Sequence, residues 1–144
     1  MHAKDKLLRT WFQRVWTEED PSAIDDMLAE GVEVTGVGAH VAIGPEGFRE
    51  AQKAILGLLA NMTVESDLIV GDPASDWTSH MFTVRGNCRR SEKPIEFGGM
   101  AFVKVEGDVI VEGYNTVDWM ALFQQLNLVD PRTLEMGLTG KLSA

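Results

Sequence analysis

Residues 95–105, IEFGGMAFVKV, alternate side chains in the period of two that is typical of a β-strand. One face of this strand carries Ile95, Phe97, Ala101, Val103 and Val105, and the other carries Glu96, Met100, Phe102 and Lys104. Neither face is plainly suited to solvent. An antiparallel sheet covered by helices on one side would leave the second apolar face in need of another cover. We therefore expect a homodimer that packs through its sheets.

The rest of the chain divides into helices first and strands afterwards. Apolar spacing and proline positions predict helices over residues 4–16, from Pro21 to Gly31, from residue 44 to about residue 60, and over 118–126. Alternation predicts strands over 32–35, 63–71, 77–87, 95–105 and 109–116, with a hairpin turn at 106–108. This order indicates an α+β domain with helices on one face of a mainly antiparallel sheet.

Length and charge limit the classes of protein to consider. The 144 residues suit one domain, which we place at residues 1–130 with a tail at 131–144. A formal charge of −9 argues against nucleic-acid partners and anionic membranes, because both attract Lys and Arg. The chain has no apolar run that could span a bilayer. Its single cysteine, Cys88, excludes an intrachain disulfide and favours a cytoplasmic location.

Asp118 is the first candidate for chemistry, because it lies where the last strand becomes the last helix. As an N-cap, its carboxylate would accept a backbone N–H of the first helical turn. Alternatively, it lies at the rim of a cavity between sheet and helices. Apolar neighbours such as Trp119 would there raise the pKa of Asp118 and suit it to general acid or base work. The two roles are compatible.

Several segments together resemble the SnoaL-like polyketide cyclase branch of the nuclear transport factor 2 superfamily. They are Gly44–Phe48, Thr83–Gly86, Ile95–Ala101, Val109–Glu112, Asn115, Asp118 and Gln124–Leu126. The resemblance implies a cone-shaped barrel, in which a strongly curved, mainly antiparallel sheet has helices packed on its concave side. It also implies dimers through the sheets, an acid/base role for Asp118, apolar walls, and neither a metal nor an organic cofactor.

The histidines are placed differently from those of the cyclases. The cyclases pair the aspartate with a histidine on the preceding strand, whereas residues 95–105 contain none. His80 is the best remaining candidate for catalysis, although a hydrogen-bonded structural role is the commoner one on an apolar strand face. His40 could lie at the pocket mouth. No histidine and carboxylate spacing suggests a metal site.

These residues lead to a functional hypothesis with an open alternative. Eight residues are predicted to contact a small apolar organic ligand: Phe12, Trp16, Phe82, Met100, Phe102, Tyr114, Asn115 and Trp119. With catalytic residues Asp118 and His80, the protein would be a cofactor-independent cyclase, isomerase or hydrolase. A binding protein without catalysis, or a dimerisation module of the same fold, is the alternative, and the missing strand histidine favours it.

Overall fold

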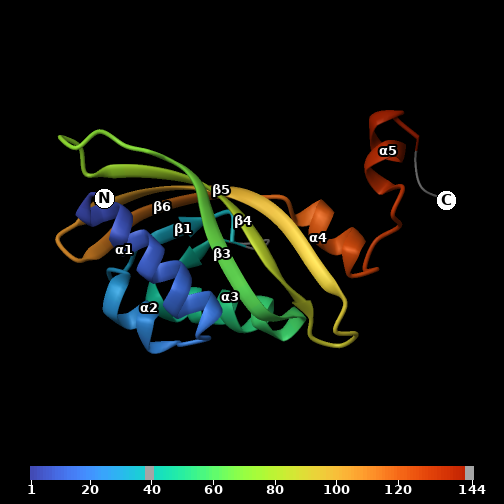
Figure 1. The fold of residues 1–144 in the computed structure, drawn as a ribbon, viewed down its shortest axis with the longest axis horizontal. Helices are drawn as coiled ribbons and strands as arrows, with labels where there is room; N and C mark the ends of the chain where they lie inside the picture. Colours follow the sequence, from blue (N-terminus) through green and yellow to red (C-terminus); the bar gives the residue numbers. More distant parts are fainter. Residues whose placement is uncertain (38–40, 142–144) are drawn as a thin grey trace.

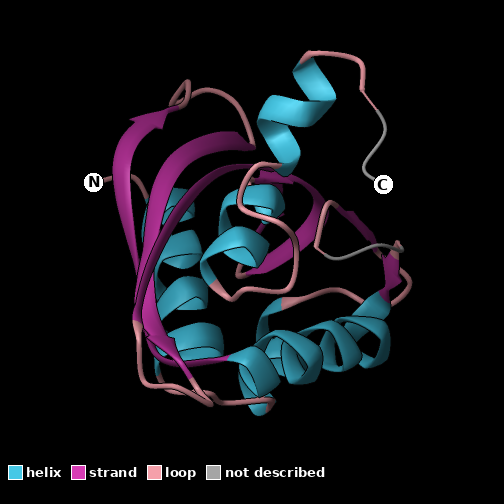
Figure 2. Ribbon diagram, turned by 90° about the vertical axis from the view of Figure 1, so that its right-hand side faces the viewer, coloured by secondary structure: helices cyan, strands magenta, loops and turns pink. Residues whose placement is uncertain are grey.

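The chain forms one mixed sheet with helices packed on one of its faces, as the α+β prediction required (Figures 1 and 2). The computed structural model describes residues 1–37 and 41–141. Its helical segments are α1 (Ala3–Phe12), the π-helix η1 (Gln13–Thr17), α2 (Ser22–Met27), α3 (Gly44–Leu58), α4 (Trp119–Gln125) and α5 (Thr133–Leu138). Its strands are β1 (Glu33–Thr35), β2 (Ala42–Ile43), β3 (Leu59–Val70), β4 (Trp77–Cys88), β5 (Pro94–Glu106) and β6 (Val109–Val117).

The strands lie in the order β2-β1-β6-β5-β4-β3. All neighbouring pairs are antiparallel except β1 and β6, which run parallel. The long strands β3 to β6 follow one another along the chain and pair in that order, since each turns directly into the next. The hairpin predicted at residues 106–108 joins β5 to β6, with Gly107 at a positive φ of 61°.

The structure differs from the predicted elements mainly at their ends, and it adds the short strand β2, which was not predicted. The second helix stops at Met27 rather than at Gly31, because Leu28 is already extended and bridges to Ile110 of β6. Strand β3 begins at Leu59, directly after α3. The predicted tail contains the helix α5, which has no buried residue and stands apart from the sheet (Figure 1).

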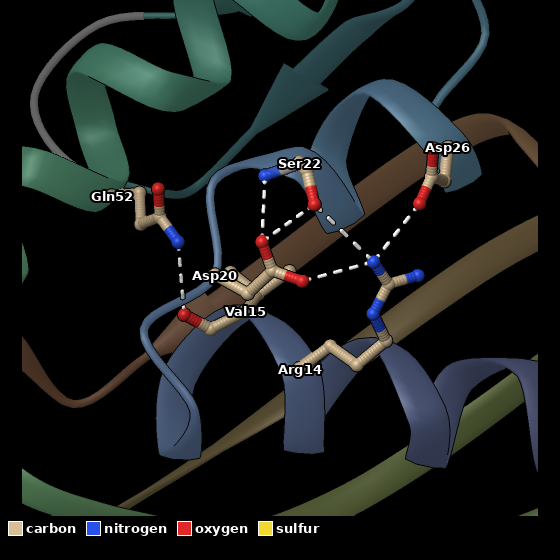
Figure 3. Close-up of polar contacts among 6 residues, drawn as sticks. All are labelled: Arg14, Val15, Asp20, Ser22, Asp26 and Gln52. Carbon is tan, nitrogen blue, oxygen red and sulfur yellow. Dashed lines mark hydrogen bonds and ion pairs between the residues drawn. The ribbon is translucent and has the colours of Figure 1, made fainter.

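The π-helical turn at the end of the first helix is fixed by polar contacts from its neighbours (Figure 3). Arg14 forms ion pairs of 2.9 Å with both Asp20 and Asp26. The buried side chain of Gln52, on α3, donates a hydrogen bond of 2.9 Å to the carbonyl oxygen of Val15. Val15 lies near the C-terminal end of the π-helix, where carbonyls have no N–H partner within the helix, so Gln52 satisfies an acceptor there.

The first turn of α1 is fixed to the β3–β4 region. The ammonium group of Lys4 donates hydrogen bonds to the carbonyl oxygens of Asp72 and Ser75, in the turn between the two strands. Asp5 accepts a hydrogen bond from the hydroxyl of Thr78 on β4. Both Lys4 and Asp5 are buried, which is unusual for charged side chains and is tolerated because each is hydrogen-bonded.

Candidate functional site

An apolar cavity of about 80 Å³ lies between the helices and the inner face of the sheet. Strand alternation supplies its β5 wall, because Phe97, Ala101 and Val103 all point inward. Aromatic residues of the helices supply much of the opposite wall, and they include Trp11, Phe12, Trp16 and Phe48. Among the described residues that line the cavity, none is titratable. The cavity can therefore hold an apolar group, but its own walls offer no acid or base.

Five of the eight predicted ligand contacts line this cavity: Phe12, Trp16, Phe82, Asn115 and Trp119. The polar groups of the last two residues already have partners. The amide of Asn115 donates a 3.0 Å hydrogen bond to the carbonyl oxygen of Thr35. The indole N–H of Trp119 donates one of 3.3 Å to the carbonyl oxygen of Gly36. The first bond joins β6 to the last residue of β1, and the second joins the first residue of α4 to the residue that follows β1.

The prediction was wrong for Met100, Phe102 and Tyr114, which lie on the outer face of the sheet. Their exposed fractions are 52%, 49% and 44%. Because Ala101 points into the cavity, its neighbours in β5 must point out, and Tyr114 lies directly opposite Phe102 on β6. Phe102 stacks on Trp77 with 4.9 Å between the ring centroids. These residues form an exposed aromatic cluster instead of a pocket wall.

Asp118 is exposed and caps α4. One oxygen of its carboxylate, Oδ1, accepts a 3.0 Å hydrogen bond from the backbone N–H of Ala121, which confirms the capping prediction. The expectation that this carboxylate faces an apolar cavity was wrong, because Asp118 does not line it. Only the residues on either side, Val117 and Trp119, do so. The strand-to-helix turn directs the capping side chain back along the helix end rather than inward.

His80 is fully buried and lies in a polar network beside the cavity, not in its lining. Its Nε2 is 3.2 Å from Oδ1 of Asp5, and its Nδ1 is 2.9 Å from the hydroxyl oxygen of Ser66. The ring of Phe12 packs edge-on against the imidazole, with the ring centroids 6.2 Å apart. The hydrogen-bonded arrangement predicted as the commoner one is therefore present. His40, the other candidate, lies outside the described residues.

The pKa values of the two buried partners favour a neutral histidine beside an ionised aspartate. Burial lowers the pKa of His80 below its ordinary value and outweighs the opposing effects of Asp5. Burial raises the pKa of Asp5. Hydrogen bonds from Thr78 and His80 and the positive charge of Lys4 outweigh that effect, and the pKa of Asp5 is lowered overall. The neutral imidazole can then donate from Nε2 to Asp5 and accept at Nδ1.

Sequence reasoning missed Asp5 and Ser66 as partners of His80. Asp5 looked like an ordinary acidic residue in the first turn of a helix. Ser66 belongs to an alternating strand in which serine carries no particular signal. A search for polar residues on the buried side of each predicted element would have singled out Asp5, since it shares a helix face with Leu8 and Phe12.

Within residues 1–37 and 41–141, no three His, Cys, Asp or Glu side chains come close enough together to hold a metal ion. Over the same residues, every helix is too short or too polar to cross a membrane.

The family of the chain follows from a comparison with models of known families. The model for the SnoaL-like polyketide cyclases matches residues 6–126, which is most of the chain. The chain belongs to the SnoaL-like polyketide cyclase family. The matched part of this SnoaL-like protein includes all the cavity walls and ends just after α4. A comparison with curated protein sequences gives no match.

Several solved structures have the same fold. TsrD from Streptomyces laurentii is 19% identical at a TM-score of 0.73, over 90% of this chain and 98% of that one. A candidate polyketide cyclase from Acidithiobacillus ferrooxidans is 15% identical at a TM-score of 0.74, over 87% and 94%. A protein of ketosteroid isomerase-like fold from Catenulispora acidiphila, in complex with trimethylamine, is 15% identical at 0.71, over 88% and 95%. At these identities the likeness shows the fold alone, which is the cone-shaped α+β fold of the superfamily.

Proposed function

We propose that this SnoaL-like protein binds a small apolar organic molecule in the cavity beneath the sheet. The observation that carries the proposal is the chemistry of the lining, which is apolar except for Asn115. Small-molecule sites in proteins are usually concave and mostly apolar with few polar groups, and the lining of this cavity has the same composition. An engineered cavity of about 150 Å³ can hold benzene. A cavity of about 80 Å³ therefore suits a small ligand, or one that displaces side chains as it enters.

Titration calorimetry with toluene tests this proposal directly. Ala101→Leu adds three carbon atoms inside the cavity, where Ala101 is 1% exposed, and should weaken toluene binding at least tenfold. Met100→Leu changes the neighbouring residue on the outer face and should leave binding unchanged. Val103→Ala would enlarge the cavity and should improve the binding of naphthalene, which covers the case in which the leucine variant folds poorly. Equal toluene affinity in all these proteins, or none in the unmodified protein, would contradict the proposal.

Acid/base chemistry by Asp118 is the second candidate. Its support is the family and the position of Asp118 between Val117 and Trp119, which both line the cavity. A proton removed next to a carbonyl would be visible as deuterium exchange at the α carbon of cyclohexanone, followed by NMR. Exchange that is lost in Asp118→Asn would support catalysis. Deuterium exchange that is no faster than in buffer would contradict the acid/base role of Asp118, and only the binding proposal would then stand.

We also propose that the outer face of the sheet is covered by a second copy of the chain. Trp77, Met81, Met100, Phe102 and Tyr114 gather on this face, and all but the half-buried Trp77 are exposed. An exposed apolar patch of this kind is typical of an interface, and a twofold axis lets one patch cover itself. Sedimentation should show that the unmodified protein is a dimer and that Phe102→Glu is a monomer. Lys53→Glu, which changes an exposed residue of α3, should remain a dimer.

We also propose a cytoplasmic location, which the single cysteine, Cys88, supports.

A further inference from the structure

A second and more polar hollow, of about 550 Å³, lies between the first helical stretch and β3. It is lined by Arg9, Thr10, Gln13, Arg14, Glu18, Val64, Glu65 and Ser66. Ser66 is half-buried, and its hydroxyl oxygen is the one that meets the ring of His80. A small molecule in this hollow would therefore contact a serine whose hydroxyl is already paired with a base.

The pairing of β3 with β4 explains how these two residues meet. Ser66 lies opposite Phe82, and His80 is two residues from Phe82 on the same inward face of β4. A β-bulge follows directly, between Ser66 and Leu68, so that Ile69 rather than Leu68 lies opposite His80. Bulges redirect side chains and are frequent beside active sites. The diagonal placement brings the hydroxyl oxygen of Ser66 within 2.9 Å of Nδ1.

Asp5 decides the direction of the hydrogen bonds in this network. Its carboxylate can only accept when ionised, so the Nε2 of His80, 3.2 Å away, must carry the hydrogen. A neutral imidazole then has its lone pair on Nδ1, and the hydroxyl of Ser66 donates to it. This is the arrangement of an activated serine: a nucleophile, a base that takes its proton, and a carboxylate that fixes the tautomer of the base.

We propose that Ser66 is the nucleophile of a site that hydrolyses small carboxylic esters, with His80 as general base and Asp5 as its positioning residue. Oγ of Ser66 attacks the carbonyl carbon while its proton passes to Nδ1 of His80. The C–O bond of the ester then breaks, and the departing alcohol takes that proton. Water then attacks the carbonyl carbon of the acyl-serine while Nδ1 of His80 accepts its proton. The bond between that carbon and Oγ breaks, and Oγ takes the proton back from His80. The products are a carboxylic acid, an alcohol and the regenerated serine.

The helical wall of the hollow supplies donors for the oxyanion that this attack creates. Arg9 lines the hollow and forms no ion pair among the described residues, whereas Arg14 is held by Asp20 and Asp26 (Figure 3). Gln13 adds an amide donor on the same wall. Donors of this kind stabilise the charge that develops on the carbonyl oxygen.

This site adjoins the apolar cavity, because Val64 lines both, but neither Ser66 nor His80 lines the cavity. The rings of Phe12 and Phe82, whose centroids are 5.3 Å apart, both belong to the cavity wall, and Phe12 also contacts His80. The binding of toluene and the hydrolysis of an ester can thus be measured, and can fail, independently.

The test combines hydrolysis of p-nitrophenyl acetate with labelling by phenylmethylsulfonyl fluoride. Peptide mapping should find the sulfonyl group on Ser66 in the unmodified protein. Ser66→Ala should lose the label and lower the hydrolysis rate constant about 100-fold, the scale of general-base assistance. Ser79→Ala is the matched control, because Ser79 lies next to His80 but points to the other face, and it should keep both activities. Labelling elsewhere, or hydrolysis unchanged in Ser66→Ala, would overturn the proposal.

Asp5→Asn tests the positioning role. The amide of asparagine can donate to Nε2, which would move the imidazole hydrogen to Nδ1 and remove the acceptor for Ser66. We expect a loss of hydrolysis together with a change of His80 tautomer in the nitrogen NMR spectrum, in a protein that still unfolds cooperatively. A merely structural role would leave the tautomer unchanged, and that result would remove Asp5 from the proposal.

Discussion

Substitutions of Asp118 separate its observed capping role from an acid/base role. The side chain makes one capping hydrogen bond of 3.0 Å, to the N–H of Ala121, at the start of a helix that contributes the fully buried Leu122 to the core. Loss of such a cap costs about 1 kcal/mol. For a domain near this size, that corresponds to a decrease in Tm of about 2–4 °C. Asp118→Ala should show this decrease in thermal unfolding followed by circular dichroism.

Asp118→Asn should unfold close to the unmodified protein, because asparagine caps about as well as aspartate. Asp108→Ala removes another exposed aspartate, in the β5–β6 turn, and is the control for a change of charge alone. Toluene affinity should not change in any of these variants, since Asp118 does not line the cavity. An asparagine variant as unstable as the alanine variant, or one that binds toluene much more weakly, would refute this account of Asp118.

Four other predictions concern backbone and buried polar groups. Gly36→Ala should destabilise the protein by at least about 1–3 kcal/mol in urea unfolding, because φ is +79° and a Cβ would lie 1.8 Å from the carbonyl oxygen of Asn115. Gly57→Ala, in α3 with open space around it, should instead stabilise it by about 0.5–1 kcal/mol, and the opposite order would contradict both. Gln52→Met should cost about 1–3 kcal/mol by leaving a buried carbonyl of η1 unpaired, whereas a cost near zero would mean that water replaces the amide. Because the pKa of His80 is lowered in the folded state, the unfolded chain binds the extra proton as pH falls below about 6.5. The free energy of unfolding should then decrease with falling pH until the folded pKa is reached. A free energy of unfolding in urea that stays constant between pH 7 and pH 5 would contradict this prediction for His80.

Alternation was enough to predict every strand except the two-residue β2, and to divide the strand residues into two faces, but not to tell which face is buried. In β5 both faces are apolar, so Met100 and Phe102 were expected at a ligand although they lie outside. Ala101, which is 1% exposed, identifies the inner face of β5, but its burial becomes visible only when the helices are in place. Both faces carry large apolar residues, Phe97 on the inner face and Met100 and Phe102 on the outer one, so side-chain size could not tell the two faces apart.

The network around His80 could not be predicted, for a different reason. Asp5 and His80 are 75 residues apart, and they meet because α1 packs across β3 and β4. Ser66 meets His80 only through the register of two strands, which a bulge then shifts. Helix packing and bulges leave weak traces in a single sequence, whereas the N-cap at Asp118 is a local feature and was predicted correctly.

The attachment of Lys4 to the β3–β4 turn has a consequence for biosynthesis. Its acceptors, the carbonyls of Asp72 and Ser75, are 68 and 71 residues further along the chain. During translation the first helix therefore leaves the ribosome well before the carbonyl groups that accept hydrogen bonds from Lys4 have been synthesised. Until then the apolar stripe of the helix and the charged side chains of Lys4 and Asp5 remain in water, so this end of the helix can dock only after the hairpin has formed.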